Sequence, residues 1–388
     1  MSEVGPGLTR QIQTYMDGLQ GRRADVPFDM AALEARAREA LTPEAWAYIA
    51  GGAGAEATAA ANRAALDRWK VVPRMARDCA SRDLTVKLFG RTLPAPLLTA
   101  PIGVLSLAHP EADLAVAHAT AALGLPMIIS NQASFPMEQI ADCAPGPKWF
   151  QLYWGRSDEL VASLAKRAEA CGCEAIVVTL DTTILGWRAR DLDQGHLPFL
   201  RGQGIAQYTS DPVFRAMLPE PPEKNPQAAA VMFTQVYSDP SLSWEKLKTL
   251  RRHTRLPILV KGIQHPEDAA LAVTHGFDGV VVSNHGGRQV DGAAGSAEML
   301  ALCADRVGGR IPVLFDSGIR GGADAFKALA MGADAVCIGR PYVWGLAAAG
   351  RAGVQAVLAN ILAELDLTLA LAGHKATAGL RRDALMAG

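Results

Sequence analysis

The chain has 388 residues and 49% of them are hydrophobic, which is enough to form a full core in one large domain or two small ones. Its 38 basic and 39 acidic side chains give a formal net charge of -1, so nothing in the composition favours binding to nucleic acid or to an anionic membrane. The N-terminus lacks the apolar stretch of a signal peptide, and no run of about 18 uncharged apolar residues follows it. We therefore expect a soluble, cytoplasmic protein.

Six cysteines are spread along the chain, at positions 79, 143, 171, 173, 303 and 337. They show neither the CxxC pairs nor the Cys/His spacing of zinc sites, and a chain of this length does not need disulfides to fold. We expect reduced, structural cysteines and no metal site.

The pattern of residue types changes after the first part of the chain. Residues 8–68 are Ala-rich with helical periodicity, and breaks are expected at 22–27 and 51–54. Beyond them, short runs rich in Val, Ile and Leu alternate with amphipathic stretches. We therefore divide the chain into an N-terminal helical segment, 1–70, packed on a domain formed by 71–388.

Eight of the apolar runs are predicted to be strands, because each is too short to be a core helix. They are Pro96–Ala100, Pro126–Ile129, Lys148–Leu152, Ala175–Leu180, Pro257–Val260, Gly279–Val282, Pro312–Phe315 and Ala335–Ile338. Continuous apolar strands that alternate with helices indicate a parallel sheet covered on both faces. Eight such units in about 250 residues fit a closed (β/α)8 TIM barrel, and a doubly wound open sheet is the alternative.

One connection is much longer than the others. The segment at about 183–240 is rich in Gly, Pro and charge, whereas such loops usually have a handful of residues. On the active face of a barrel, a loop of this length is either a lid or a disordered insertion. We favour a lid for its first half and expect a mobile stretch at 219–230.

In a barrel enzyme the chemistry lies at the C-terminal ends of the strands. Polar side chains or bare backbone follow every predicted strand, namely Pro101-Ile-Gly103, Ser130-Asn-Gln132, Gln151 and Tyr153, Thr179 and Asp181, Lys261, Ser283 to Arg288, Asp316 to Arg320, and Gly339-Arg340. A barrel that served only as a scaffold would not need polar groups after every strand. An active site is therefore predicted at the C-terminal ends of the strands.

Two of these strand ends have the composition of a phosphate site. Asp316-Ser-Gly318 with Arg320, and then Gly339-Arg340, follow the last two strands. Barrels often bind a phosphate at this place through backbone N–H groups, small residues and a helix N-terminus. A phosphorylated ligand is therefore expected; the alternative is that these glycines serve tight turns alone.

A Gly-rich turn after the sixth predicted strand carries His285 and, three residues later, Arg288. An imidazole can accept a proton near neutral pH, and a guanidinium can bind a carboxylate through two parallel hydrogen bonds. Their place at a strand end favours a catalytic role over that of an inert loop histidine.

These motifs together resemble the FMN-dependent 2-hydroxy acid oxidase and dehydrogenase family. The likeness runs from Ala47-Tyr48 to Gly339-Arg340 and is carried by Ser283-Asn-His-Gly-Gly-Arg-Gln289, Thr99-Ala-Pro-Ile-Gly103, Phe150-Gln-Leu-Tyr153, Thr179-Leu-Asp-Thr182, Leu259-Val-Lys-Gly262 and Asp316-Ser-Gly-Ile-Arg320.

The resemblance implies that FMN lies across the barrel mouth. The phosphate of FMN would be held near Gly318, Gly339 and Arg340, with Arg320 close by. The ring would be contacted by the backbone of Pro101, Ile102 and Gly103, and its polar edge by Ser130, Gln151 and Thr179. Ser283 and Asp316 would also approach the cofactor, and Lys261 would stabilise the anionic reduced flavin.

The resemblance also implies roles toward a small 2-hydroxy acid. The carboxylate of the substrate would be bound by Arg188, Arg288 and the hydroxyl of Tyr48. Tyr153 would bond the 2-hydroxyl, His285 would be the base, and Asp181 would stabilise the imidazolium.

Three residues have alternative interpretations. Asp181 is also placed to cap a helix, and Tyr48 is also suited to packing in an Ala-rich helix. Gln132 follows the second predicted strand, and the sequence leaves open whether its side chain lines the substrate pocket.

Within the family, Gly186-Trp-Arg-Ala-Arg-Asp-Leu-Asp193 and the rest of the long segment most resemble lactate 2-monooxygenases, which convert L-lactate and O2 to acetate, CO2 and water. Gly103 leaves more room over the flavin than the alanine of lactate and glycolate oxidases. Thr183-Ile184 stands where several oxidases have Pro-Arg, so Arg188 is the one arginine that we assign from this segment.

Other functions stay open at this point. They are an oxidase that releases keto acid and H2O2, a mandelate or lactate dehydrogenase with another acceptor, an FMN barrel that catalyses isomerisation, and a barrel in which flavin is a structural ligand. The resemblance further implies a homotetramer or homo-octamer.

Overall fold

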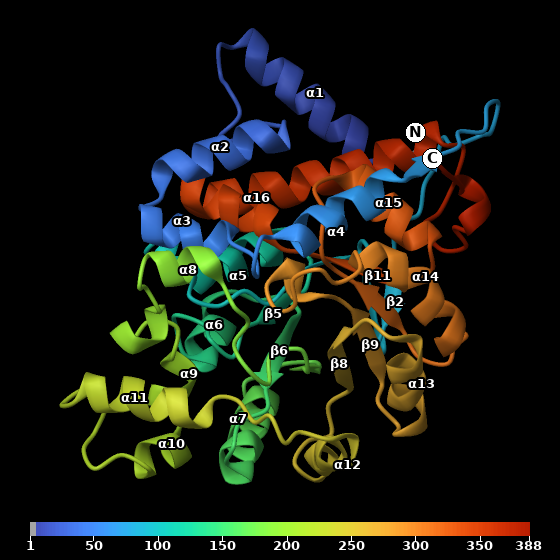
Figure 1. Ribbon diagram of the computed structural model, residues 1–388. Helices are drawn as coiled ribbons and strands as arrows, with labels where there is room; N and C mark the ends of the chain where they lie inside the picture. The colour runs from blue at the N-terminus through green and yellow to red at the C-terminus, as the bar shows by residue number, and fades with distance from the viewer. Residues whose placement is uncertain (1–4) are drawn as a thin grey trace.

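The computed structural model describes residues 5–388, and its centre is a closed barrel of eight parallel strands (Figure 1). Around the barrel the strands follow the order β10-β11-β4-β5-β6-β7-β8-β9. Their bounds are β4 Leu97–Thr99, β5 Met127–Ile129, β6 Lys148–Tyr153, β7 Ile176–Thr179, β8 Ile258–Ile263, β9 Gly279–Val282, β10 Val313–Phe315 and β11 Ala335–Ile338. The predicted TIM barrel is confirmed, and the open sheet is wrong.

Four of the predicted strands begin one residue too early, at a proline. Proline has no N–H group, so it cannot donate to the hydrogen-bond ladder, although its carbonyl group can still accept. Pro257 O, for example, accepts a hydrogen bond from Ile176 N at 2.8 Å. The observed strands therefore start at the residue after each proline.

Alternate strand residues point inward and fill the barrel. This inner core contains Leu98, Ile128, Trp149, Val177, Leu259, Val281, Leu314 and Cys337. A hairpin of β2 Val86–Leu88 and β3 Arg91–Leu93 adds to it from the N-terminal end, where Phe89 packs edge-on against Trp149 with ring centroids 5.5 Å apart. The space for a ligand is thus at the opposite, C-terminal end.

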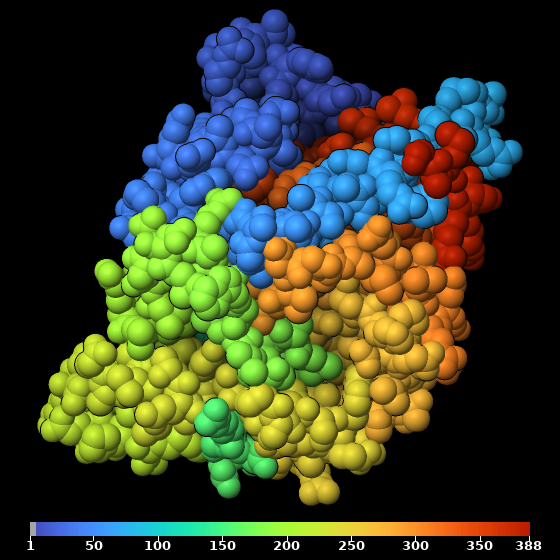
Figure 2. Space-filling model, viewed as in Figure 1, coloured from blue at the N-terminus to red at the C-terminus, as the bar shows by residue number. Residues whose placement is uncertain are grey.

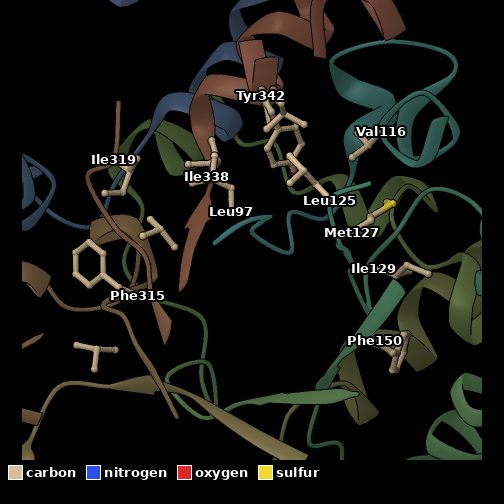
Figure 3. Close-up of a cluster of buried hydrophobic side chains, with 14 of the residues drawn as sticks. Leu97, Val116, Leu125, Met127, Ile129, Phe150, Phe315, Ile319, Ile338 and Tyr342 are labelled. Atoms are coloured by element: carbon tan, nitrogen blue, oxygen red, sulfur yellow. The ribbon is translucent and has the colours of Figure 1, made fainter. Parts of the chain in front are cut away.

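The remaining strand residues point outward against a ring of helices. Figure 3 shows part of this layer, in which Leu97 and Met127 of the strands lie in one cluster with Val116 of α5 and Tyr342 of α16. The helices of the ring are α5 Ala112–Leu123, α6 Met137–Cys143, α7 Asp158–Ala170, α13 Pro266–Thr274, α14 Ser296–Val307, α15 Gly322–Ala330 and α16 Arg340–Leu371. Short 3-10 turns, η1 Leu105–Leu107, η3 Thr249–Arg252 and η5 Arg382–Ala384, join some of the elements, and β1 Trp69–Val71 pairs antiparallel with β12 Leu385–Ala387.

The N-terminal part forms α1 Pro6–Leu19, α2 Met30–Ala40, α3 Pro43–Ala50 and α4 Ala57–Asp67. In Figure 1 these blue helices lie along the red helix α16, against which α1 and α2 pack. One break was not predicted: Thr42 separates α2 from α3 and caps α3 by accepting a hydrogen bond from Ala45 N at 3.2 Å. By length and composition α16 could also cross a membrane, but half of its apolar window is buried inside the protein, as in a core helix.

The long segment between β7 and β8, which we call the lid, is folded. It contains α8 Ala189–Asp193, η2 Pro198–Arg201, α9 Ala206–Thr209, α10 Pro212–Ala216 and α11 Pro226–Val236, followed by α12 Trp244–Lys248. The structure differs from the mobile stretch expected at 219–230, because residues 226–230 belong to α11 and Ala229 and Ala230 are buried.

Aromatic rings join separate parts of the lid, and one arginine ties the lid to helix α7 of the ring. Phe233 packs against Phe199 and Tyr237, with ring centroids 5.1 and 5.0 Å apart. Arg167 of α7 donates from Nη1 to Asp211 Oδ2 at 3.0 Å, and Asp211 Oδ1 caps α10 by accepting from Val213 N at 2.8 Å. Apolar contact therefore holds the parts of the lid together, and a largely buried ion pair holds the lid to the ring of helices.

Candidate active site

A cavity lies at the C-terminal mouth of the barrel, lined by α3, the strand ends and the lid, and with the solvent at its opening it holds about 1040 Å³ of empty space. In Figure 2 the N-terminal helices in blue, the lid in green and the turn around residue 290 in orange meet on the surface, and backbone hydrogen bonds from Ala53 N to Gly287 O and from Gly54 N to Trp187 O join them. The predicted site residues on the cavity wall are Tyr48, Pro101, Ile102, Gly103, Gln132, Tyr153, Arg188, Lys261, His285, Arg288, Asp316, Gly318, Arg320, Gly339 and Arg340.

Of the other predicted residues, Ser130, Asp181 and Ser283 hydrogen-bond to Gln132, His285 and Lys261 of this wall. The alternation of the strands explains how the polar side chains reach the mouth: Gln151, Thr179, Lys261, Ser283 and Asp316 each come two residues after an inward-pointing core residue, and all five are buried. The two-residue alternation that fills the barrel with apolar side chains thus also places polar side chains at the C-terminal end of the barrel.

His285 and Asp181 form a hydrogen-bonded pair, with 2.7 Å between His285 Nδ1 and Asp181 Oδ1. Burial raises the pKa of the Asp181 carboxyl, but the neighbouring imidazole outweighs this and holds it below the ordinary value. The carboxylate therefore accepts a hydrogen bond from the Nδ1–H group, which leaves the Nε2 lone pair directed to the other side. There Nε2 lies 3.5 Å from the Tyr153 hydroxyl. Burial lowers the pKa of His285, so the ring is a neutral base at pH 7.

The turn that carries His285 is held in an unusual conformation. His285 has a φ of 59°, which is rare for a residue with a side chain. Ser317 Oγ accepts hydrogen bonds from Asn284 N at 3.3 Å and Gly286 N at 3.0 Å, on both sides of the histidine. Asn62 of α4 and Asn284 exchange two side-chain hydrogen bonds of 2.8 and 2.7 Å. The N-terminal segment thus helps to position the base.

Arg188, which is buried, and Arg288, which is half-buried, bring two positive charges to one side of the cavity. Arg288 Nη1 donates to Tyr48 O and to Gly51 O, each at 2.7 Å, and its guanidinium lies 5.1 Å from the Tyr48 ring centroid. Arg188 Nη2 donates to Gln289 Oε1 at 3.1 Å. Within residues 5–388 neither arginine has an ion-pair partner, and burial together with Arg188 lowers the pKa of Arg288 to about 10. An anionic ligand would compensate these charges.

Lys261 has a partner that the sequence did not reveal. Its Nζ lies 3.0 Å from Asp316 Oδ2 and donates to Ser283 Oγ at 2.8 Å. Burial by itself lowers the pKa of Lys261, but Asp316 and Asp181 raise it well above its ordinary range. Lys261 therefore stays charged at the cavity wall. Asp316, which was predicted to approach the cofactor, also balances this buried ammonium group.

At the other end of the cavity, Arg340 begins α16 and Arg320 precedes α15. Arg340 donates to Ile49 O, Gly286 O and Gly51 O at 3.3, 3.0 and 2.9 Å, and Arg320 lies 4.8 Å from the Trp344 ring centroid. Burial and nearby arginines lower the pKa of Arg340 to about 9 and that of Arg320 to about 10. Two helix N-termini and two arginines make this end suited to a phosphate.

Gly103 is more crowded than the sequence suggested. A Cβ at this position would lie 2.8 Å from Gln132 Cβ and 2.9 Å from Gln132 O, closer than such atoms come in proteins. Gln132, for which no role was decided from the sequence, lines the cavity beside Gly103. The glycine thus lets the backbone of Gln132 approach.

The remaining polar groups fit a flavin. Gln151 Nε2 and Thr179 Oγ1 are buried and have no partner within residues 5–388. Gln151 Oε1 accepts from Ser130 Oγ at 3.3 Å, which orients its amide. Buried unpartnered donors are costly, and the polar edge of an isoalloxazine ring would satisfy both. Those groups would hold the ring of FMN, and Gly318, Gly339 and Arg340 would hold its phosphate.

Sequence reasoning missed several residues of the site. Ile49, Leu185, Phe199, Tyr237, Ser317 and Ile319 line the cavity without having been assigned to it. Phe199 and Tyr237 belong to the lid, where no strand alternation indicates which way a side chain points. Ser317 stands in the noted Asp-Ser-Gly motif, so its position was visible although its contact with the His285 turn was not.

Comparison with known proteins bears directly on this site. The family model described as FMN-dependent dehydrogenase matches residues 37–387. An L-lactate oxidase of Lysinibacillus sphaericus is 44% identical over 360 residues, which cover 92% of each chain. The 2-hydroxyacid oxidase 1 of Homo sapiens is 39% identical over 88% of this chain and 91% of its own length. A solved structure of mandelate oxidase is 40% identical and superimposes with a TM-score of 0.82, covering 93% of this chain and 98% of that one. This chain therefore belongs to the FMN-dependent dehydrogenase family and is an FMN-dependent oxidoreductase of 2-hydroxy acids.

Proposed function

We propose that this enzyme oxidises a small L-2-hydroxy acid, L-lactate, with O2 and retains the keto acid until acetate, CO2 and water are formed. The observation that carries the proposal is the pair of arginines, the buried Arg188 and the half-buried Arg288, beside a neutral His285 in a cavity that lid residues help to enclose. Two guanidinium groups without an ion-pair partner in the described chain match one carboxylate, and a nearby base matches the adjacent C–H and O–H groups.

The side chains divide the work as follows. Arg188, Arg288 and Tyr48 bind the carboxylate and orient the 2-carbon toward His285. His285 Nε2 accepts a proton, and Asp181 stabilises the imidazolium that results. The Tyr153 hydroxyl, 3.5 Å from that nitrogen, binds the substrate oxygen. FMN, when bound, supplies the two-electron acceptor, and Lys261 places a positive charge where the reduced cofactor is anionic.

The lid supports retention of the keto acid. The lid residues Leu185, Arg188, Phe199 and Tyr237 line the cavity, and Phe199 also contacts Tyr48 edge-on with ring centroids 6.4 Å apart. A closed site that excludes water would keep the keto acid beside the peroxide formed by O2, which favours oxidative decarboxylation over release.

The second candidate is an oxidase that releases pyruvate and H2O2. The relative that is 44% identical is named an L-lactate oxidase, and this favours the second candidate. Both candidates need the same His285, Arg188 and Arg288, and they differ in the step after flavin reduction.

The test is aerobic turnover of the purified FMN-loaded protein with L-lactate, with acetate, pyruvate and H2O2 measured together. Acetate without free H2O2 supports the proposal. Pyruvate with matching H2O2 overturns it in favour of the oxidase, and flavin bleaching without O2 uptake indicates a dehydrogenase. If L-lactate does not bleach the flavin but (S)-mandelate does, the assigned substrate size is wrong.

A further inference from the structure

Two cysteines outside the active site lie in sulfur contact. Cys171 follows the last residue of α7, Cys173 precedes β7, and their Sγ atoms are 4.0 Å apart. Cys171 is partly exposed, whereas Cys173 is 3% exposed. The reaction proposed above uses neither residue, and the sequence had suggested that all six cysteines are inert.

The two thiols are chemically unequal. The contact with the Cys173 thiol lowers the pKa of Cys171, while the contact with Cys171, together with burial, raises the pKa of Cys173. A thiol with a lowered pKa and access to solvent is the one that reacts with oxidants, and a neighbouring thiol can then resolve the product. Exposure and proximity thus assign Cys171 as the attacking thiol and Cys173 as the resolving one.

We propose that Cys171 and Cys173 are a peroxide-reactive pair that forms a reversible disulfide. The Cys171 thiolate attacks one oxygen of hydrogen peroxide and becomes a sulfenic acid, with hydroxide as the leaving group. The Cys173 thiol then attacks the Cys171 sulfur, the S–S bond forms, and water leaves with the Cys173 proton. Peroxide is reduced by two electrons, and the two thiols are oxidised to one disulfide.

The local backbone permits this closure. Gly172, between the cysteines, has a φ of +82° and no atom within 4 Å of the place where a Cβ would stand. The turn is therefore open on that side. A disulfide across a single residue closes a small ring, and strained or exposed disulfides are readily reduced by thiols. The modification is thus expected to be reversible.

The pair also stands at the end of the helix that holds the lid. Cys171 N donates to Arg167 O at 2.9 Å, and Arg167 is the residue that binds Asp211 of the lid. The disulfide would therefore form one turn away from the lid anchor.

The experiment uses the reduced full-length, FMN-loaded protein, treated with about equimolar hydrogen peroxide in the absence of substrate, alkylated with N-ethylmaleimide and digested with trypsin. Both cysteines lie in one tryptic peptide, 168–188, with no other cysteine. We expect this peptide to lose two hydrogens, to escape alkylation and to be restored by dithiothreitol. The peptide 92–148, which carries the partly exposed Cys143, serves as the internal control and should be alkylated.

Variants distinguish the two roles. With Cys173→Ser, dimedone should trap a sulfenic acid at Cys171, and more peroxide should carry it to the sulfinic acid. With Cys143→Ser, the disulfide should form as in the unaltered protein. Alkylation of both cysteines after peroxide treatment, or oxidation of Cys143 at the same rate, would overturn the proposal.

A second arm replaces added peroxide by turnover with L-lactate, with and without catalase. This arm rests on peroxide release, as in the oxidase candidate above. A disulfide that forms with added peroxide but not during turnover shows that no free peroxide is produced, and it leaves the assignment of the cysteine pair intact.

Discussion

The imidazole of His285 donates from Nδ1 to Asp181 across 2.7 Å, although the two residues are 104 positions apart and belong to the ends of β9 and β7. The ionised carboxylate decides which nitrogen carries the proton, and it thereby leaves Nε2 free to act as a base toward the cavity.

Replacing the base should abolish chemistry and spare the cofactor. In His285→Ala we expect FMN to be retained and the anaerobic bleaching of the flavin by L-lactate to slow by about a hundredfold to ten-thousandfold, because the proton acceptor is gone. Stopped-flow absorbance measures this rate. His253→Ala, a histidine outside the cavity, is the matched control. A loss of less than tenfold would remove His285 from this role, as would be expected if the flavin were a structural ligand.

The pH dependence should report Asp181. In the unaltered enzyme burial lowers the pKa of His285 below its ordinary 6.5, so kcat/KM should fall as the pH drops through this lowered value. Asp181 opposes the shift, so in Asp181→Asn the acid limb should move to a still lower pH. The plateau rate should also fall by about a hundredfold or more, since an amide no longer selects the reactive tautomer. A limb that moves to higher pH would contradict this arrangement.

A lysine should not replace Arg288. The guanidinium donates hydrogen bonds to Tyr48 O and Gly51 O while it faces the cavity. An ammonium group cannot reproduce this planar set of hydrogen bonds. We expect Arg288→Lys to weaken lactate use about tenfold to a hundredfold, mainly through KM. Steady-state kinetics at fixed O2 measures it, with Arg351→Lys on the surface as the control. Unchanged KM and kcat would exclude Arg288 from the carboxylate site.

A methyl group at Gly103 should disturb the backbone of Gln132. The added Cβ would meet Gln132 Cβ at 2.8 Å and its carbonyl oxygen at 2.9 Å. We expect Gly103→Ala to cost about 1–3 kcal/mol of stability and to lower FMN retention, as other overpacked sites do. Thermal unfolding of the FMN-loaded protein measures the loss. Gly18→Ala, where a Cβ meets nothing within 4 Å, is the control and should not destabilise.

Opening the lid should change the product. Phe199→Ala removes a cavity wall and the ring that contacts Tyr48, so the keto acid should escape earlier. The ratio of acetate to pyruvate should fall. Free H2O2 should rise by the same amount as the pyruvate that the variant forms in excess of the unaltered enzyme. Leu200→Ala, an exposed neighbour on the same turn, should leave the ratio unchanged. An unaltered ratio in Phe199→Ala would show that this ring does not hold the product.

Much of the fold was predictable, because strand length and helical periodicity are local properties. Gly279–Val282 and Ala335–Ile338 have the bounds that the pattern predicted, and the other strands differ mainly at their ends. The lid was harder to predict, because α11 is stabilised by packing of Phe233 against Phe199, a contact that joins two separate stretches of sequence.

The sequence by itself determined that polar residues follow every strand of a barrel, because period-two alternation and strand polarity together direct those side chains to one end. Only the tertiary structure decided which of them meet. Lys261 with Asp316, Asn62 with Asn284 and His285 with Asp181 are pairs of residues far apart in the chain. Their distances depend on barrel closure and on the packing of the N-terminal helices, and no local pattern in the sequence encodes these.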